Sequence, residues 1–96
     1  MILHLKHNFM AHIEKLLEEI RATPKNVRFS DLEKICNHYF GKPRNKSTSH
    51  NVYKTPWAGD PRVNIQKEKN GEAKTYQVKQ VIAAIDKMKG EKNGKP

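Results

Sequence analysis

Cysteine is almost missing from this chain of 96 residues, which has Cys36 and no second cysteine to pair with it. A disulfide framework within the chain and a zinc site built from cysteine pairs are therefore excluded, and a single thiol is typical of a reducing compartment. No apolar run approaches the roughly 20 residues of a membrane-spanning helix, and residues 1–7 are too short and interrupted for a signal peptide. We therefore expect a cytoplasmic protein.

The motifs of common cofactor-dependent and metal-dependent enzymes are also missing. The chain has no glycine-rich dinucleotide or phosphate loop, and Asp60 is the single acidic residue between Gly41 and Lys67. Paired carboxylates, or metal ions held on them, therefore lack their ligands in that segment. We expect no cofactor, no metal and no small-molecule substrate, and one domain with a small core and an active site on an open surface.

Negative charge is in short supply, since 19 lysines and arginines face 10 acidic residues and the net charge is +9. This balance favours a polyanionic partner, either nucleic acid or an anionic membrane surface. A membrane surface is usually bound by a basic amphipathic helix. The longest apolar stripe here, near the N-terminus, carries Glu14, Glu18 and Glu19. We therefore place nucleic acid ahead of membrane.

Two segments in the first half of the chain have the apolar spacing of amphipathic helices. The first helix is predicted at 9–22, with Asn8 as its N-cap. The second is predicted to begin at Ser30, because Ser30 and Glu33 form the pattern of a capping box, and to end before Gly41.

The end of the chain is predicted as a third helix over 74–89, closed by Gly90 as its C-cap. Residues 90–96 are polar and basic, and we expect them to form a disordered tail. Between the second and third helices the helical period disappears. Short strands are predicted at 50–55 and 62–66, with a weaker one at 42–46.

The orientation of the 50–55 strand decides where its first residue, His50, lies. Val52 and Tyr53 point to opposite faces of a strand, and both are apolar enough to be buried. With Tyr53 inward, His50 lies on the open face beside Val52; with Val52 inward, His50 shares the core side at the edge of the strand. The residues leave both arrangements open. In the 62–66 strand, Val63 and Ile65 should point inward.

The predicted order of helix, helix, three strands and helix favours an α+β domain. Its simplest form is a small three-stranded antiparallel sheet with helices packed on one face. We expect residues 1–89 to form this one domain, with 29–89 as its core and 9–22 as an additional N-terminal helix.

One basic stretch, from Gly41 to Lys54, combines phosphate-binding groups with a histidine, the side chain that most readily exchanges a proton near neutral pH. The imidazole of His50 can take the proton of an RNA 2′-hydroxyl that attacks the adjacent phosphorus, while cations stabilise charge on the phosphoryl oxygens. The alternative is a surface histidine on a solvated basic face. The candidate RNA-binding residues are Lys42, Arg44, Lys46, Ser49 and Lys54.

The run from Phe29 to Met88 resembles the HicA toxins of bacterial toxin–antitoxin pairs. The resemblance is carried by the order of three motifs: the aromatic-glycine step Tyr39-Phe40-Gly41, the pair Ser49-His50 followed by Tyr53, and the closing amphipathic helix from Tyr76 to Ile85. It departs from the family at Thr48, where a glycine usually precedes the Ser-His pair.

This resemblance implies a fold like the double-stranded RNA-binding domain and ribosome-independent cleavage of mRNA, with His50 as the catalytic residue. It also implies a cognate HicB-type antitoxin that covers or displaces the site. In this hypothesis His50 acts as a general base without a metal. Two other functions stay open on the residues alone: a non-catalytic RNA-binding module of the same fold, and an adaptor whose cations meet an acidic protein.

Overall fold

The computed structural model describes residues 2–59 and 62–92, and it describes side chains for 12–59 and 62–90. Its elements are α1 (Ile2–Ala22), α2 (Phe29–Phe40), β1 (Asn45–Lys46), β2 (His50–Lys54), β3 (Arg62–Gln66) and α3 (Thr75–Lys92). The strands form an antiparallel sheet in the order β1-β2-β3. The predicted α+β class, with its three-stranded antiparallel sheet, is confirmed.

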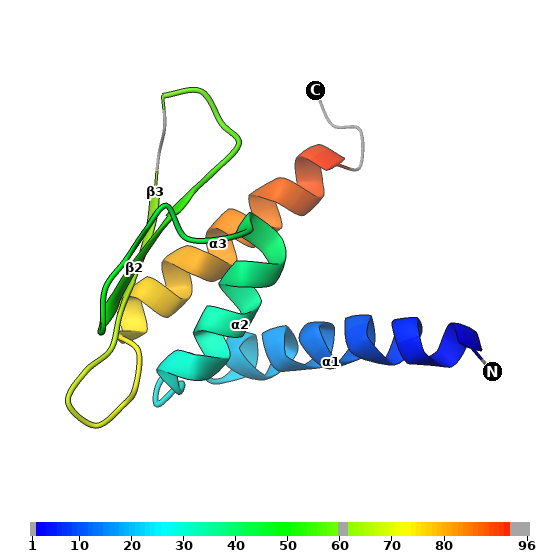
Figure 1. Ribbon diagram of the computed structural model, residues 1–96, viewed down its shortest axis with the longest axis horizontal. Coiled ribbons are helices and arrows are strands. Elements are labelled where there is room, and N and C mark those ends of the chain that lie inside the picture. The colour runs from blue at the N-terminus through cyan, green and yellow to red at the C-terminus, as the bar shows by residue number, and fades with distance from the viewer. Residues whose placement is uncertain (1, 60–61, 93–96) are drawn as a thin grey trace.

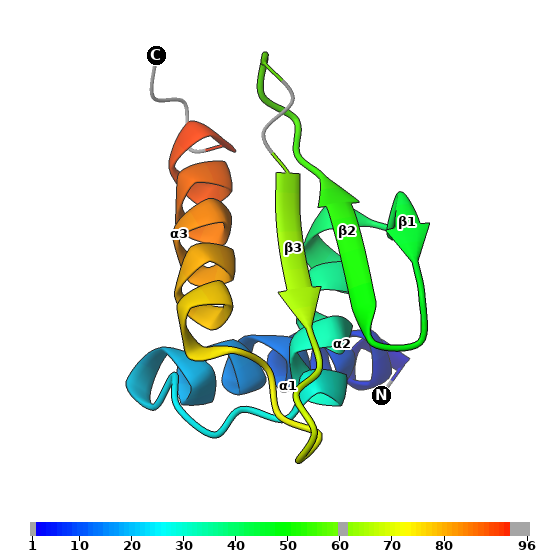
Figure 2. The same cartoon turned by 90° about the vertical axis from the view of Figure 1, so that its left-hand side faces the viewer.

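The helices cover one face of this sheet and leave the other open. Figure 1 shows the sheet nearly edge-on, with α2 and α3 on the same side of it. Figure 2 looks onto the open face, where no helix lies in front of the strands. Helix α1 packs against α2 and α3 rather than against the sheet, so the molecule has a sheet layer, a helix layer and a further helix outside it.

Strand alternation sets which side chains enter the core. Val63 and Ile65 are 5% and 0% exposed, so the prediction that they point inward is confirmed. In β2, Tyr53 is fully buried within the core cluster and Asn51 lies buried on the same side. Since successive residues of a strand point to opposite faces, His50 belongs to the open face.

Helix α1 begins at Ile2, so the prediction that it begins at residue 9 with Asn8 as N-cap is wrong. The sequence period explains the difference, because Ile2 and Leu5 continue the spacing of Phe9 toward the N-terminus. Asparagine in a helix interior costs only a fraction of a kcal/mol, so Asn8 does not stop the helix. In Figure 1 the first turns of α1 extend beyond the rest of the molecule.

The C-terminal half of α1 is attached to the domain by apolar and ionic contacts. Ile13, Leu17 and Ile20 are buried. Arg21 donates two hydrogen bonds to the Asp86 carboxylate of α3, at 2.8 and 2.9 Å, and this contact lowers the pKa of Asp86. Both side chains are about half exposed, so the pair orients the two helices more than it stabilises them.

Helix α2 begins at Phe29, and the predicted capping box of Ser30 with Glu33 does not form. The carbonyl of Arg28 accepts the first helical hydrogen bonds instead. The chain is fixed just before this point, because the Phe29 N–H donates to Gly71 O at 3.0 Å. Glu33 turns toward the sheet, where it contacts buried side chains described below. The predicted end of α2 before Gly41 is confirmed.

Two other predicted boundaries need correction. Strand β1 covers two residues rather than 42–46, since Pro43 has no N–H to donate and pairing begins with the Arg44 N–H, which donates to Val52 O at 2.7 Å. Helix α3 runs to Lys92, so Gly90 is not its C-cap and a disordered tail over 90–96 is wrong for 90–92. The remainder of that tail, 93–96, lies outside the described residues.

No helix in the described part of the chain combines the length and hydropathy that crossing a membrane requires.

Two glycines should respond oppositely to substitution by alanine. Gly41 has φ of 84° and ψ of −163°, a region that an L side chain adopts only with strain, so Gly41→Ala should lower the free energy of unfolding by about 1–3 kcal/mol. Gly90 lies in helical backbone with open space around it, so Gly90→Ala should raise it by up to about 1 kcal/mol. Urea unfolding of the two variants measures both, and shifts of the same sign would contradict the assigned backbone.

Candidate functional site

A tight turn between β1 and β2 positions His50. The Ser47 N–H donates to His50 O at 2.8 Å, and the Ser47 hydroxyl donates to the same oxygen at 3.3 Å. Thr48 and Ser49 form the exposed tip. The Lys67 N–H donates to Ser49 O at 2.9 Å, which ties the turn to the chain that follows β3. The backbone around His50 is therefore held from both neighbouring segments.

The imidazole of His50 lies on the open face of the sheet. His50 is half-buried, and its ring makes no hydrogen bond or ion pair with any other described residue. Its neighbours across the sheet come from β3, where Gln66 is its register partner. The ring nitrogens are therefore available to a ligand that approaches this face.

Two strand cations lie on this face, at the end of the β2–β3 pair away from His50, and the strands add no carboxylate to it. The three strands contain no aspartate or glutamate. Lys54 and Arg62 are register partners at the far end of the β2–β3 pair, and alternation puts both on the open face.

The structure brings some of the predicted site residues together. Ser49 lies at the turn directly before His50, and Lys54 shares the open face of β2 with it. Arg44 precedes β1 and hydrogen-bonds through its backbone to β2, with an exposed side chain. These three residues therefore flank the histidine along its strand and at its edge.

Lys42 and Lys46 lie apart from that group. Lys42 is exposed in the connection directly after Gly41, at the end of α2. Lys46 points to the helix side of the sheet, where its Nζ lies 3.3 Å from Glu33 Oε2. The register explains this, because Lys46 pairs with the inward-facing Asn51. The prediction grouped Lys46 with His50, and the two belong to opposite faces.

Sequence reasoning missed Arg62 and Asn64, the residues of β3 that share the open face. Their alternation with Val63 and Ile65 was the available signal, since inward positions imply outward ones between them. The alternation in the sequence does not give the register of the β2–β3 pair, which places Arg62 beside Lys54. Within the described residues, no three histidine, cysteine, aspartate or glutamate side chains group closely enough to hold a metal ion.

A buried polar cluster supports β2 from behind. Tyr53 donates its hydroxyl to Asn37 Oδ1 at 2.8 Å and accepts from Asn51 Nδ2 at 3.2 Å, while Asn51 Nδ2 also donates to Glu33 Oε2 at 2.9 Å. Burial raises the pKa of Tyr53 to about 12, so its hydroxyl stays protonated and able to donate. This cluster joins β2 to α2 and fixes the orientation of the strand that carries His50.

Comparison with known proteins identifies no relative of this chain. A scan against family models, a search of curated proteins and a search of solved structures each found no match. The resemblance to HicA toxins and the likeness to the double-stranded RNA-binding domain therefore stay predictions that rest on the residues and their geometry.

Removing one hydroxyl tests the cluster. Tyr53→Phe keeps the buried ring but removes the donor to Asn37 Oδ1 and one of the two acceptors of Asn51 Nδ2, which keeps its bond to Glu33. The free energy of unfolding should therefore fall by about 1 kcal/mol in urea. Tyr76→Phe is the matched control, because Tyr76 is 55% exposed and such surface changes stay within about 0.5 kcal/mol. Equal effects of the two substitutions would show that the cluster does not stabilise the fold.

Proposed function

We propose that this chain is an endoribonuclease that cleaves mRNA, with His50 as the general base. The observation that carries the proposal is an accessible imidazole without a described partner, on a sheet face that carries Lys54 and Arg62 and no strand carboxylate. A catalytic base must be reachable and free to accept a proton, whereas a structural histidine is usually hydrogen-bonded into its surroundings.

The chemistry requires only groups that RNA and this surface supply. The neutral imidazole of His50 accepts the proton of a ribose 2′-hydroxyl, and the 2′-oxygen attacks the adjacent phosphorus. The bond from phosphorus to the 5′-oxygen of the next nucleotide breaks, which leaves a 2′,3′-cyclic phosphate. The imidazolium, or water, returns a proton to the departing 5′-oxygen. Lys54 and Arg62, at the other end of the same face, bind phosphates of the neighbouring nucleotides and hold the RNA strand against it.

The flanking residues have supporting tasks in this proposal. Lys42 and Arg44, in the connection between α2 and β1, bind phosphates further along the RNA, and Arg44 can do so with two parallel hydrogen bonds. The Ser49 hydroxyl orients the scissile group from the turn. Lys46 contributes positive potential but no direct contact beside His50, since it faces Glu33.

The proposal extends to the biological setting of the HicA family. The chain would be the toxin of a type II toxin–antitoxin pair, inhibiting translation in the cytoplasm by cleaving mRNA. Its helix–three strands–helix core would correspond to the double-stranded RNA-binding fold, with α1 as an addition. A HicB-type antitoxin with acidic side chains would neutralise the toxin by covering the cationic face that carries His50.

His50→Gln should abolish cleavage while leaving the fold intact, because the side chain is only half-buried and has no described partner to lose. Loss of a general base reduces a rate by about 100- to 10,000-fold, measured as cleavage of an end-labelled mRNA and as relief of growth arrest on expression. His12→Gln, at an exposed position of α1, is the control and should cleave like the wild type.

Two results would overturn the mechanism or the activity. Cleavage by His50→Gln at the wild-type rate would remove His50 from the mechanism. Salt-sensitive RNA binding by the wild type without any cleavage product would instead identify a non-catalytic RNA-binding module.

Neutralising the open face should weaken RNA binding in a salt-dependent way. Lys54→Gln and Arg62→Gln each remove a cation that the proposal places on phosphate, so the slope of log binding constant against log salt should shrink by about 0.7 per substitution. Lys15→Gln removes one charge from an exposed position of α1 and should leave the slope nearly unchanged. Identical slopes for all three variants would show that binding depends on net charge and not on this face.

A further inference from the structure

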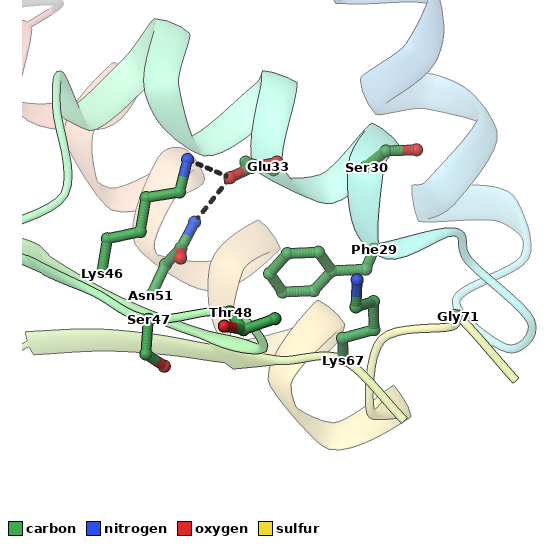
Figure 3. A pocket seen from close by; sticks show the side chains of 9 residues that line it. All are labelled: Phe29, Ser30, Glu33, Lys46, Ser47, Thr48, Asn51, Lys67 and Gly71. Atoms are coloured by element: carbon green, nitrogen blue, oxygen red, sulfur yellow. Dashed lines mark hydrogen bonds and ion pairs between the residues drawn. The ribbon is translucent and has the colours of Figure 1, made fainter. Parts of the chain in front are cut away.

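A polar pocket lies on the other side of the β1–β2 turn from the open sheet face. It is a cavity of about 390 Å³ between the first turns of α2, the turn itself and the chain after β3. Figure 3 shows Glu33, Lys46 and Asn51 on one side of it and Phe29 with Lys67 on the other. Thr48, at the tip of the turn, lies between these two sides.

The first observation that points to a ligand is the unpaired side-chain oxygen of Asn51. Asn51 is fully buried, and its Oδ1 has no hydrogen-bond donor among the described residues. The amide cannot be turned to repair this, because Nδ2 must face the Glu33 carboxylate, which only accepts. A buried acceptor left without a donor costs stability, so its presence requires an explanation such as a bound group.

Glu33 offers a second acceptor at the same place. Its Oε2 takes both the Lys46 ion pair and the Asn51 hydrogen bond, while Oε1 has no described partner. The Lys46 ammonium still has hydrogen atoms to donate beside it. This side of the pocket therefore presents two acceptors next to a donor.

The other side of the pocket presents an aromatic ring that can contact a flat ligand. The ring of Phe29 lines the cavity although the residue is only 6% exposed, and the Lys67 ammonium lies over the ring, 5.9 Å from its centroid. A base would contact this ring once the flexible Lys67 side chain moves aside, and the ammonium would then be placed to bind the attached phosphate. A free phosphate fits this pocket poorly, because it can only accept hydrogen bonds and Glu33 repels it.

We propose that the pocket binds a guanine base of the RNA substrate. The Watson–Crick edge of guanine carries two adjacent donors, N1–H and the N2 amino group, beside the O6 acceptor, and no other standard RNA base presents two donor groups there. N1–H would donate to Glu33 Oε1, the amino group to Asn51 Oδ1, and Lys46 to O6. Since Oδ1 is closed off from solvent in the free protein, the contact requires a small adjustment of the pocket on binding.

This inference rests on the proposed function and adds a sequence preference to it. Thr48 lines the pocket, and His50 follows two residues later at the end of the same turn. An RNA strand that crosses the exposed tip of the turn, Thr48 and Ser49, would place a guanine on the helix side of the sheet. A neighbouring phosphate of the RNA would then lie on the open face. We therefore expect cleavage next to guanosine.

Binding of short RNAs to the full chain tests the pocket separately from catalysis. The probes are 2′-O-methylated uridine oligomers, which cannot be cleaved, with one central guanosine, adenosine, cytidine, uridine or inosine. Guanosine should bind about 5- to 100-fold more tightly than adenosine, cytidine or uridine. Inosine lacks only the N2 amino group, so it should bind at least about 5-fold more weakly than guanosine.

Glu33→Gln should remove most of the guanosine preference while general RNA affinity persists or rises, since a negative charge is lost. Glu14→Gln, exposed on α1, makes the same charge change away from the pocket and should keep the preference. Equal binding of all oligomers by the wild type would overturn the guanine pocket and leave the proposed ribonuclease standing. Failure to bind any oligomer would overturn both. A preference that survives Glu33→Gln would place guanine recognition elsewhere and overturn this pocket.

Discussion

Burial of Tyr53 is the constraint on which the arrangement of this protein depends. Tyr53 and Asn51 take the face of β2 that packs against the helices and are fully buried, while Val52 on the opposite face is 9% exposed. Every neighbour in β2 is assigned by that choice, since a shift of one residue would exchange the two faces. His50 faces outward because Tyr53 faces inward, and the proposed chemistry exists only in this arrangement.

Burial of Tyr53 and Asn51 places a polar cluster inside a small core. Asn51 and Tyr53 reach Asn37 and Glu33 of α2, so strand and helix are joined by directional hydrogen bonds as well as by apolar packing. Directional contacts tolerate a shift of register less well than apolar ones, because a displaced donor loses its acceptor. The same cluster leaves Asn51 Oδ1 incomplete, which links the stability of the fold to the proposed recognition of a base.

Local patterns in the sequence predicted the parts of the fold that depend on near neighbours. The alternation around Val63 and Ile65 gave β3, and Gly41 gave the end of α2. Contacts between the helices and the sheet could not be predicted from such local patterns. Glu33 was assigned to Ser30, three residues away, whereas its partner Asn51 is eighteen residues further along the chain. For the same reason His50 was found as a candidate from its basic surroundings, whereas the pocket containing Glu33 and Lys46 was not.

The shortness of β1 limits how an inhibitory protein could bind to this sheet. With two paired residues, its outer edge gives a foreign strand almost nothing to hydrogen-bond along. An inhibitor that extended the sheet from that side would gain little affinity from its backbone. Effective inhibition would instead require a partner that covers the exposed strands with complementary charge. The affinities of that partner and of RNA for this face would then both fall as ionic strength rises.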